Sequence, residues 1–112
     1  HPRQGHKLAV PTKEGVLYVD HEKIIALQAD GSYTWVYCEA GKRLLVSRNL
    51  HSLSAELPHA LFFRCHRAHV INLAMVESVL HHGGYRVLLK TGLVITVARS
   101  RWAALLIAMK DV

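Results

Sequence analysis

Side chains that can donate hydrogen bonds or bind a metal are concentrated in one short segment in the second half of the chain. The stretch Arg64-Cys65-His66-Arg67-Ala68-His69 places two arginines, two histidines and a thiol within six residues. Guanidinium groups make paired hydrogen bonds to guanine edges and to phosphates, so nucleic acid is one candidate ligand. Thiolates and imidazoles are ligands that zinc prefers, so a metal ion is a second. The spacing of these residues decides between the two.

The spacing is unfavourable for a metal site and for catalysis. Neighbouring side chains of a strand point to opposite faces, so Cys65 and His66 could hardly share a zinc ion without a bend. The chain lacks paired Cys-x-x-Cys or His-x-x-x-His spacing, a phosphate-binding glycine loop and a nucleophile elbow. We therefore expect no metal, no cofactor and no enzymatic activity. The two cysteines, Cys38 and Cys65, are interpreted as buried thiols of a cytoplasmic protein.

The charge distribution favours an anionic partner. The chain carries 14 Lys and Arg against 8 Asp and Glu, a net charge of +6 with neutral histidines. Residues 42–101 contain nine basic and two acidic residues, a net of +7, whereas the rest of the chain has five basic and six acidic residues, a net of −1. Such an uneven distribution predicts a basic face. Its partner could be nucleic acid, an acidic protein or an anionic membrane surface.

Short β-strands are the elements expected to position this basic segment. Apolar runs rich in β-branched and aromatic residues alternate with turns such as Asp30-Gly31-Ser32 and Thr91-Gly92. With 112 residues, 51% of them hydrophobic, the chain is predicted to form one mainly β domain with antiparallel hairpins. The predicted strands are Leu8–Val10, Gly15–Val19, Ile24–Gln28, Tyr33–Cys38, Arg43–Ser47, Leu61–His66, His69–Asn72, Met75–Leu80, Tyr85–Leu89 and Leu93–Ala98.

Two short amphipathic helices are predicted between and after these strands. Asn49 can cap the first, which presents Leu50, Leu53 and Leu57 on one face and ends at Pro58. Ser100 can cap the second, whose apolar face would consist of Trp102, Leu105, Leu106 and Met109. Both are interpreted as packing elements. The longest apolar run, Trp102 to Met109, is far shorter than the ~18 residues expected of a membrane span, so no membrane segment is predicted.

Four segments in register resemble the LytTR-type DNA-binding domain. The segment Leu61-Phe62-Phe63-Arg64-Cys65-His66-Arg67-Ala68-His69-Val70-Ile71-Asn72-Leu73 is similar to the family's F-x-R-x-H-R-S-like stretch, which runs into a V-N pair. Asp30–Tyr33 resembles its loop between strands, and Ser47–Leu53 its leucine-containing helix. Thr91-Gly92 followed by Ile95–Ser100 resembles its closing stretch. The resemblance covers roughly residues 7–109.

The resemblance implies the output domain of a bacterial transcription regulator that binds double-stranded DNA. It implies a mainly β fold, an elongated array of antiparallel sheets in the β-β-β arrangement with two short helices, which inserts loops into successive major grooves. Family members commonly follow a receiver or sensory domain and bind repeated sites, so we expect such an upstream domain, and a dimer on DNA is compatible with it. Residue 1 is His rather than Met, which is consistent with a fragment. Residues 1–6 are expected to be a disordered tail or linker, and residues 7–112 the domain.

The resemblance also assigns candidate DNA contacts. The base-reading positions of the family correspond to Tyr33, Arg67 and Arg99. Contacts to the DNA backbone are expected from Lys42, Arg48, Arg64, His66, Ser100 and Arg101. The residue types at positions 33 and 67 differ from those of relatives, and Ala98 stands where a serine is usual, so the preferred bases cannot be transferred.

Simpler interpretations of the same residues remain open. Each arginine could be a solvated surface charge or part of an ion pair, and Tyr33 could pack with Trp35 and Tyr37. For the whole chain, the alternative function is that of a basic β-rich interaction module that docks to an acidic protein or an anionic membrane surface. Such a module would bind DNA weakly and without sequence preference, so a footprint on DNA would distinguish the two functions.

Overall fold

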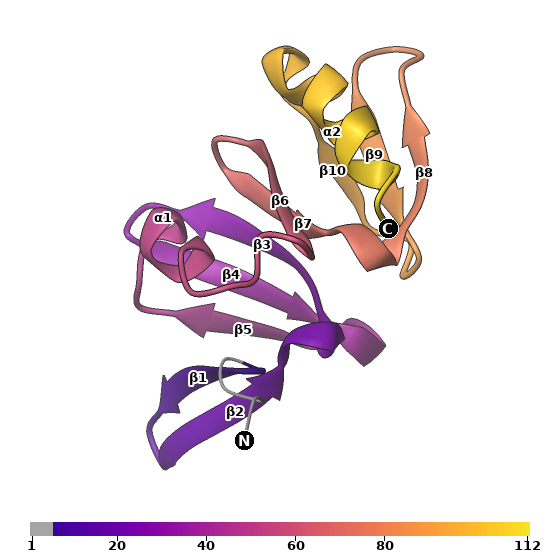
Figure 1. Ribbon diagram of the computed structural model, residues 1–112. Coiled ribbons are helices and arrows are strands. Elements are labelled where there is room, and N and C mark those ends of the chain that lie inside the picture. The colour runs from indigo at the N-terminus through magenta and orange to yellow at the C-terminus, as the bar shows by residue number, and fades with distance from the viewer. Residues whose placement is uncertain (1–5) are drawn as a thin grey trace.

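The computed structural model describes residues 6–112, and they form an elongated, mainly β protein of 44 × 33 × 25 Å (Figure 1). Within residues 6–112, ten strands form three antiparallel sheets with the strand orders β1-β2, β5-β4-β3-β7-β6 and β10-β9-β8. This confirms the predicted fold class. The strands are β1 (Lys7–Thr12), β2 (Gly15–Asp20), β3 (Ile24–Asp30), β4 (Tyr33–Cys38), β5 (Arg43–Val46), β6 (Phe62–His66), β7 (His69–Asn72), β8 (Val76–Leu80), β9 (Arg86–Leu89) and β10 (Val94–Thr96).

Helical elements connect and cover the sheets. The two α-helices are α1 (Leu50–Ser54) and α2 (Trp102–Met109). Four short 3-10 turns are η1 (His21–Lys23), η2 (Glu39–Gly41), η3 (Leu73–Met75) and η4 (Arg99–Arg101). Figure 1 shows the β1–β2 hairpin at one end of the molecule, the five-stranded sheet in the middle, and α2 with the three-stranded sheet at the other end.

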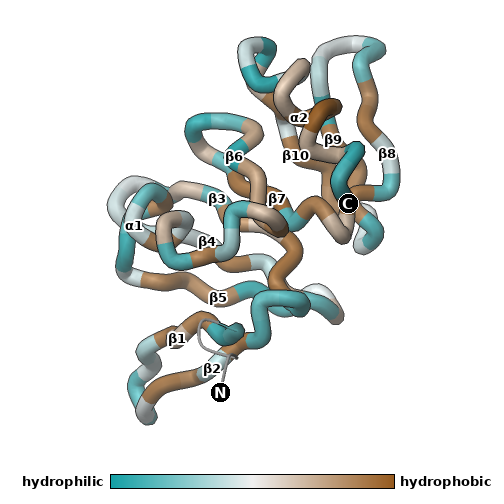
Figure 2. The backbone as a smooth tube through the Cα atoms, viewed as in Figure 1, coloured by the Kyte–Doolittle hydropathy of each residue, from teal (hydrophilic) through white to brown (hydrophobic). Residues whose placement is uncertain are grey.

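The central five-stranded sheet carries a hydrophobic core on each face. Because successive side chains of a strand point to opposite faces, Leu27 of β3 packs into one core and its neighbour Ala26 into the other. Val70 and Ile71 of β7 divide in the same way. The first core also receives Leu8 and Val10 of β1 and Leu50, Leu53 and Leu57 from α1 and the turn after it. The second receives Val87, Leu89, Ile95 and Val97 of the three-stranded sheet and its C-terminal extension, and Leu105 of α2. Figure 2 shows the resulting hydrophobic stretches along the strands, with hydrophilic residues at the tip of the β6–β7 hairpin.

The first helix is capped as predicted, whereas the second is not. The Asn49 Oδ1 accepts a hydrogen bond from the backbone N–H of Ser52 at 2.7 Å, so Asn49 caps α1. The prediction that Ser100 caps the second helix is wrong. Ser100 lies inside η4, and α2 begins at Trp102 without a side-chain cap. The backbone N–H of Ala98 is bonded to a carbonyl of β6, so the chain makes a 3-10 turn from Ala98 before α2 can start.

The apolar face of α2 also differs from the prediction. Leu105 is fully buried, and Trp102, Ala108 and Met109 pack around the second core, but Leu106 is 39% exposed. The helix has a single buried residue and turns Leu106 toward solvent. No helix among residues 6–112 is long and apolar enough to cross a membrane.

The predicted tail lies mostly outside the described residues, because the first five residues are not described. The carbonyl of His6 accepts a hydrogen bond from the N–H of His21 at 2.8 Å, so His6 contacts the body of the domain. Both cysteines are free and buried, as predicted.

Candidate nucleic-acid interface

Four connecting segments lie together at one end of the central sheet, where β3 turns into β4 and β6 turns into β7. Strand β3 pairs with β4 through Asp30 and Tyr33 and with β7 through Gln28 and His69, so the β3–β4 and β6–β7 turns are neighbours. Val46 of β5 pairs with Thr34 next to the first of these turns, which places the connection to α1 at the same end. The segment leading into η4 is bonded to β6 beside the second turn. We call residues 30–33, 47–49, 66–69 and 98–101 the turn edge.

The β3–β4 turn is a tight hairpin connection that exposes Tyr33. Gly31 has a φ of 62°, a conformation that favours glycine in two-residue hairpin turns. The Trp35 Nε1 donates a hydrogen bond to Asp30 Oδ2 at 3.0 Å, which fixes the start of the turn. Tyr33 is 47% exposed at the first position of β4. About half of the Tyr33 surface is therefore accessible to a partner at this turn.

Nearby side chains form hydrogen bonds with the backbone of the β6–β7 turn. Arg64 donates from Nε to the carbonyl of His66 at 3.2 Å and from Nη2 to the carbonyl of Arg67. The N–H of Ala68 donates to His66 Nδ1 at 3.0 Å, and the carbonyl of Ala68 accepts from the N–H of Ala29 on β3 at 2.8 Å. The side chain of Arg67 is exposed at the tip of this bonded turn.

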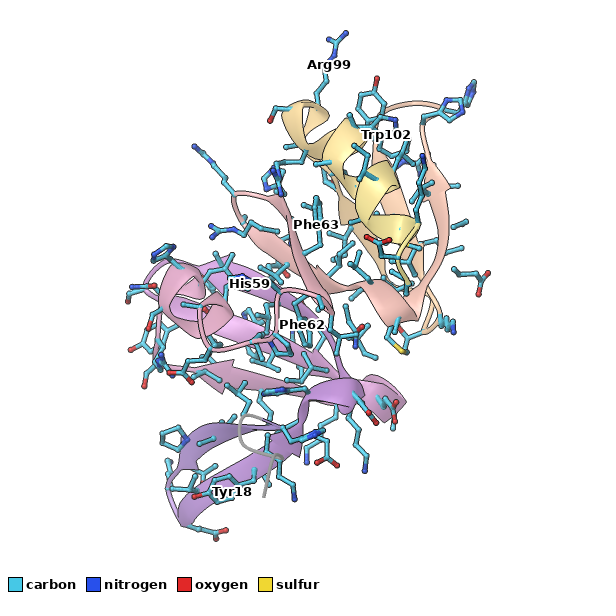
Figure 3. All side chains as sticks on the ribbon, in the orientation of Figure 1. Tyr18, His59, Phe62, Phe63, Arg99 and Trp102 are labelled. Atoms are coloured by element: carbon cyan, nitrogen blue, oxygen red, sulfur yellow. The ribbon has the colours of Figure 1, made fainter. Side chains whose placement is uncertain are left out.

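The 3-10 turn η4 lies against β6. The Arg101 Nε donates to the carbonyl of Arg64 at 2.9 Å, and the Arg101 guanidinium carbon lies 4.6 Å from the centroid of the Phe63 ring. Arg99 and Ser100 are exposed, and Figure 3 shows Arg99 projecting away from the body of the protein beside α2. An open pocket of about 430 Å³ separates the two turns and is lined by Arg64, His66, Arg67, Ala98, Ser100 and Arg101.

Arg48 belongs to the turn edge but is engaged within the chain. Its Nη2 lies 2.6 Å from Glu56 Oε2 and donates to Ser52 Oγ at 2.7 Å, while its carbonyl accepts from Thr34 Oγ1 at 2.8 Å. The hydrogen bond between the Arg48 and Glu56 side chains raises the pKa of Arg48 and lowers the pKa of Glu56. An ion pair was the simpler interpretation of an arginine in this sequence, and at Arg48 it is what the structure has.

Lys42 lies at the opposite end of the sheet. It follows η2 in the connection between β4 and β5, next to the pair formed by Tyr37 and Arg43. The length of β4, roughly 17 Å at ~3.3 Å per residue, separates this connection from the β3–β4 turn. The structure therefore brings together all the predicted contact residues except Lys42.

Burial shifts the pKa values of His69 in the turn edge and of Cys65 beneath it. The rings of His66 and His69 lie 5.2 Å apart, and burial together with the neighbouring His66 lowers the pKa of His69. Burial raises the pKa of the Cys65 thiol to about 12, so it stays protonated at neutral pH. Among residues 6–112 no group of three or more His, Cys, Asp or Glu side chains is arranged to hold a metal ion. Cys65 faces the second core, whereas His66 contributes to the pocket between the turns.

Comparison with known proteins identifies the family of the chain. A model of the LytTr DNA-binding domain matches residues 14–110. The chain belongs to this family. As a member of this family, the chain is a DNA-binding domain, and such domains occur in regulators of transcription.

Known relatives agree in sequence and in fold. The heme-containing CO-sensing transcriptional regulators RcoM 2 and RcoM 1 of Paraburkholderia xenovorans (strain LB400) are each 32% identical to the chain over 72 residues. The match covers 64% of this chain and 27% of each regulator. A solved LytTr DNA-binding domain of a response regulator from Bacillus cereus superposes with a TM-score of 0.79 at 21% identity, over 93% of this chain and 96% of that one. It has the same fold.

Two positions of the interface have no distinguishing sequence signal. Phe63 supplies the aromatic face on which Arg101 lies, and Ala98 attaches η4 to β6 through its backbone N–H. Both contacts join residues more than 30 positions apart, so neither local periodicity nor residue spacing indicates them.

Proposed function

We propose that this LytTr domain binds double-stranded DNA in a sequence-specific manner, by inserting the turn edge into the major groove, and that Arg67, Arg99 and Tyr33 contact the bases. One observation carries the proposal: the Arg67 and Arg99 side chains are exposed on two adjacent turns whose backbones are bonded to the body of the protein. A guanidinium group can bond O6 and N7 of guanine together, and such a contact discriminates between bases by about 1–3 kcal/mol. The exposed Tyr33 hydroxyl can reach a base from the neighbouring turn.

Contacts to the DNA backbone are proposed for the residues around these three. His66, Ser100, Arg64 and Arg101 line the pocket between the two turns. Each arginine side chain has five N–H donors, so both keep donors beyond their internal hydrogen bonds. Arg48 would approach a phosphate beside Glu56, and Lys42 would contact DNA only where the duplex extends along the sheet. Because phosphate neutralisation releases counterions, affinity should fall steeply with salt.

We infer further that the chain is the output part of a longer cytoplasmic regulator without enzymatic activity, with residues 7–112 as the DNA-binding unit. Support comes from the relatives, which are transcriptional regulators of which this chain spans 27%. An upstream receiver or sensory domain, repeated binding sites and a dimer on DNA belong to the same proposal.

The test is selection of duplexes from a random pool, followed by footprinting of the selected sequence. A protected consensus is expected, and Arg67→Ala and Arg99→Ala should each reduce preference for it over a scrambled duplex by about 10-fold or more while the fold is retained. Arg43→Ala is the matched control, because Arg43 lies at the opposite end of the sheet, over the Trp35 ring at 4.2 Å. Selection of no consensus, together with tight binding to anionic vesicles or an acidic protein, would contradict the proposal.

A further inference from the structure

We propose that Arg64 and Arg101 are positioning residues that bond the turn carrying Arg67 and the turn carrying Arg99 into one unit of fixed spacing. The inference rests on the proposed function, because it concerns how the two base-reading side chains are placed relative to each other. Its basis is a continuous set of hydrogen bonds that runs from one turn to the other through β6.

Arg64 sets the conformation of the first turn. Its guanidinium donates to the carbonyls of both His66 and Arg67, the residue before the tip and the tip residue itself. These two carbonyls flank the Cα of Arg67 along the backbone, so bonding both restricts the direction in which the Arg67 side chain leaves the chain. The carbonyl of Ala68, the next residue, is bonded to β3, so the turn is attached on both of its sides.

Arg101 and Ala98 attach the second turn to the same strand. Ala98 donates its N–H to the carbonyl of Cys65 at 2.8 Å, and Arg101 donates Nε–H to the carbonyl of Arg64 at 2.9 Å. The turn between them is closed by a bond from the Arg101 N–H to the Ala98 carbonyl at 2.8 Å. Arg99 therefore lies in a short loop whose two ends are bonded to consecutive carbonyls of β6.

The chemistry at position 101 requires arginine rather than a positive charge alone. The planar guanidinium lies over the Phe63 ring while its Nε–H donates to the Arg64 carbonyl. A lysine ammonium is a compact point charge on a flexible stem and lacks the planar fork that makes both contacts together. Turns held by these hydrogen bonds need no further ordering when they enter the groove. The entropy cost of binding is therefore lowest for the DNA sequence whose guanines match the spacing between Arg67 and Arg99.

Arg101→Lys separates positioning from phosphate binding because it keeps the charge. The duplex selected by the wild-type chain and a scrambled duplex are the two probes, and affinity for each is measured across a salt series. Because Arg101 is also proposed to contact a phosphate, the readout is the ratio of the two affinities. We expect Arg101→Lys to lose ~10-fold more affinity for the selected duplex than for the scrambled duplex, the loss expected for one misplaced guanine contact, with the salt dependence retained because the charge is kept. Repeating the selection with Arg101→Lys should give a consensus that has lost information at the positions read by both Arg67 and Arg99.

Controls and a second variant keep the outcomes decisive. Phe63→Leu changes no charge and removes the aromatic face, so a smaller loss in the same direction is expected. Circular dichroism and thermal unfolding check that both variants fold. If Arg101→Lys does not fold, the affinities of Phe63→Leu for the two duplexes test the positioning role. Wild-type discrimination in the folded variants, or an equal loss on both duplexes, overturns the positioning role and leaves the proposed function intact. Failure of the wild-type chain to select any consensus overturns the proposed function itself.

Discussion

The turn edge and the β1–β2 hairpin are attached to the central sheet by different physical means. At the turn edge, directed hydrogen bonds fix individual backbone groups: Arg64 and Arg101 donate to carbonyls, and His66 accepts from the N–H of Ala68. The hairpin instead packs Leu8 and Val10 into the first core, with Leu17 and Val19 beside them. Hydrophobic burial is non-directional, whereas a hydrogen bond requires particular distances and angles. The turn edge is therefore held in a defined orientation, whereas the hairpin is held against the core without a strict orientation.

The surfaces of the two regions differ accordingly. The ion pairs at the hairpin and at η1 beside it are long and exposed, from Lys7 to Asp20 at 3.9 Å and from Lys23 to Asp20 at 4.0 Å. The side-chain hydrogen bonds of Thr12 stay within the β1–β2 turn. Its outer face exposes Val16 (51%) and Tyr18 (62%). Figure 3 shows Tyr18 and Arg99 near opposite ends of the molecule. Substitution of buried side chains in the hairpin should therefore affect stability, while substitution of exposed side chains at the turn edge should affect recognition.

The largest effect on stability is expected for Leu8→Ala in the hairpin. Leu8 is 1% exposed, and removing a buried leucine side chain typically lowers the free energy of unfolding by about 2–5 kcal/mol. Urea denaturation measures the loss, and Leu45→Ala on the exposed edge strand β5 is the control, because Leu45 is 47% exposed. Discrimination between DNA duplexes by the folded fraction should not change. A loss of specificity in Leu8→Ala would contradict the division of roles.

A smaller loss is expected for Asn49→Ala, at the turn edge. The Asn49 side chain accepts the hydrogen bond from the Ser52 N–H at the start of α1, and removal of such a cap costs about 1 kcal/mol. Asn49→Ser retains an acceptor and should remain within a few tenths of a kcal/mol of the wild-type chain. Thermal and urea unfolding compare the variants. Equal losses for both substitutions would show that the cap is unimportant here.

The pH dependence of stability should involve one histidine from each region, half-buried His69 at the turn edge and buried His21 beside the hairpin. Burial lowers the pKa of His69 in the turn edge and of His21 at the junction with the hairpin, from an ordinary value of 6.5. The unfolded chain thus binds protons that the folded chain excludes, and the free energy of unfolding should fall as the pH decreases below about 6.5. His69→Gln and His21→Gln should each flatten this dependence, as measured by urea unfolding at pH 7.5 and 5.5. A stability that rises on acidification would contradict the prediction.

The smallest effect is expected for Tyr18→Ser on the outer face of the hairpin. Tyr18 is mostly exposed, and surface substitutions away from special features change stability by less than about 0.5 kcal/mol. DNA affinity and discrimination should both equal those of the wild-type chain in binding titrations. A clear loss of DNA affinity would place the hairpin in the interface and remove the contrast between the two regions.

The strands could be predicted from the sequence because their pattern is local. All ten predicted strands are present, with ends displaced by up to two residues. The continuous apolar run of β3, from Ile24 to Leu27, is explained by a strand buried on both faces, and α1 has the predicted cap. How the strands divide into three sheets could not be predicted, since periodicity does not state which strands pair. The predicted start of α2 was wrong because the true start depends on the hydrogen bond from the Ala98 N–H to the Cys65 carbonyl, a contact between distant segments.

The candidate site was predictable to a similar extent. The exposure of Arg67 and Arg99 follows from their positions in turns, which the sequence indicates. The engagement of Arg64 and Arg101 depends on backbone carbonyls as acceptors, and every residue has one, so no residue type marks the partner. Lys42 shows the converse difficulty: it belongs to the basic segment in sequence, but the length of β4 separates it from the turn edge.

The β6–β7 turn is bonded through the carbonyl of residue 67 and not through its side chain. Any amino acid supplies that carbonyl, so the side chain at this position can be exchanged without dismantling the turn. Under the proposed function, a single substitution at position 67 would therefore change the preferred operator, while the scaffold that orients the residue would be inherited unchanged.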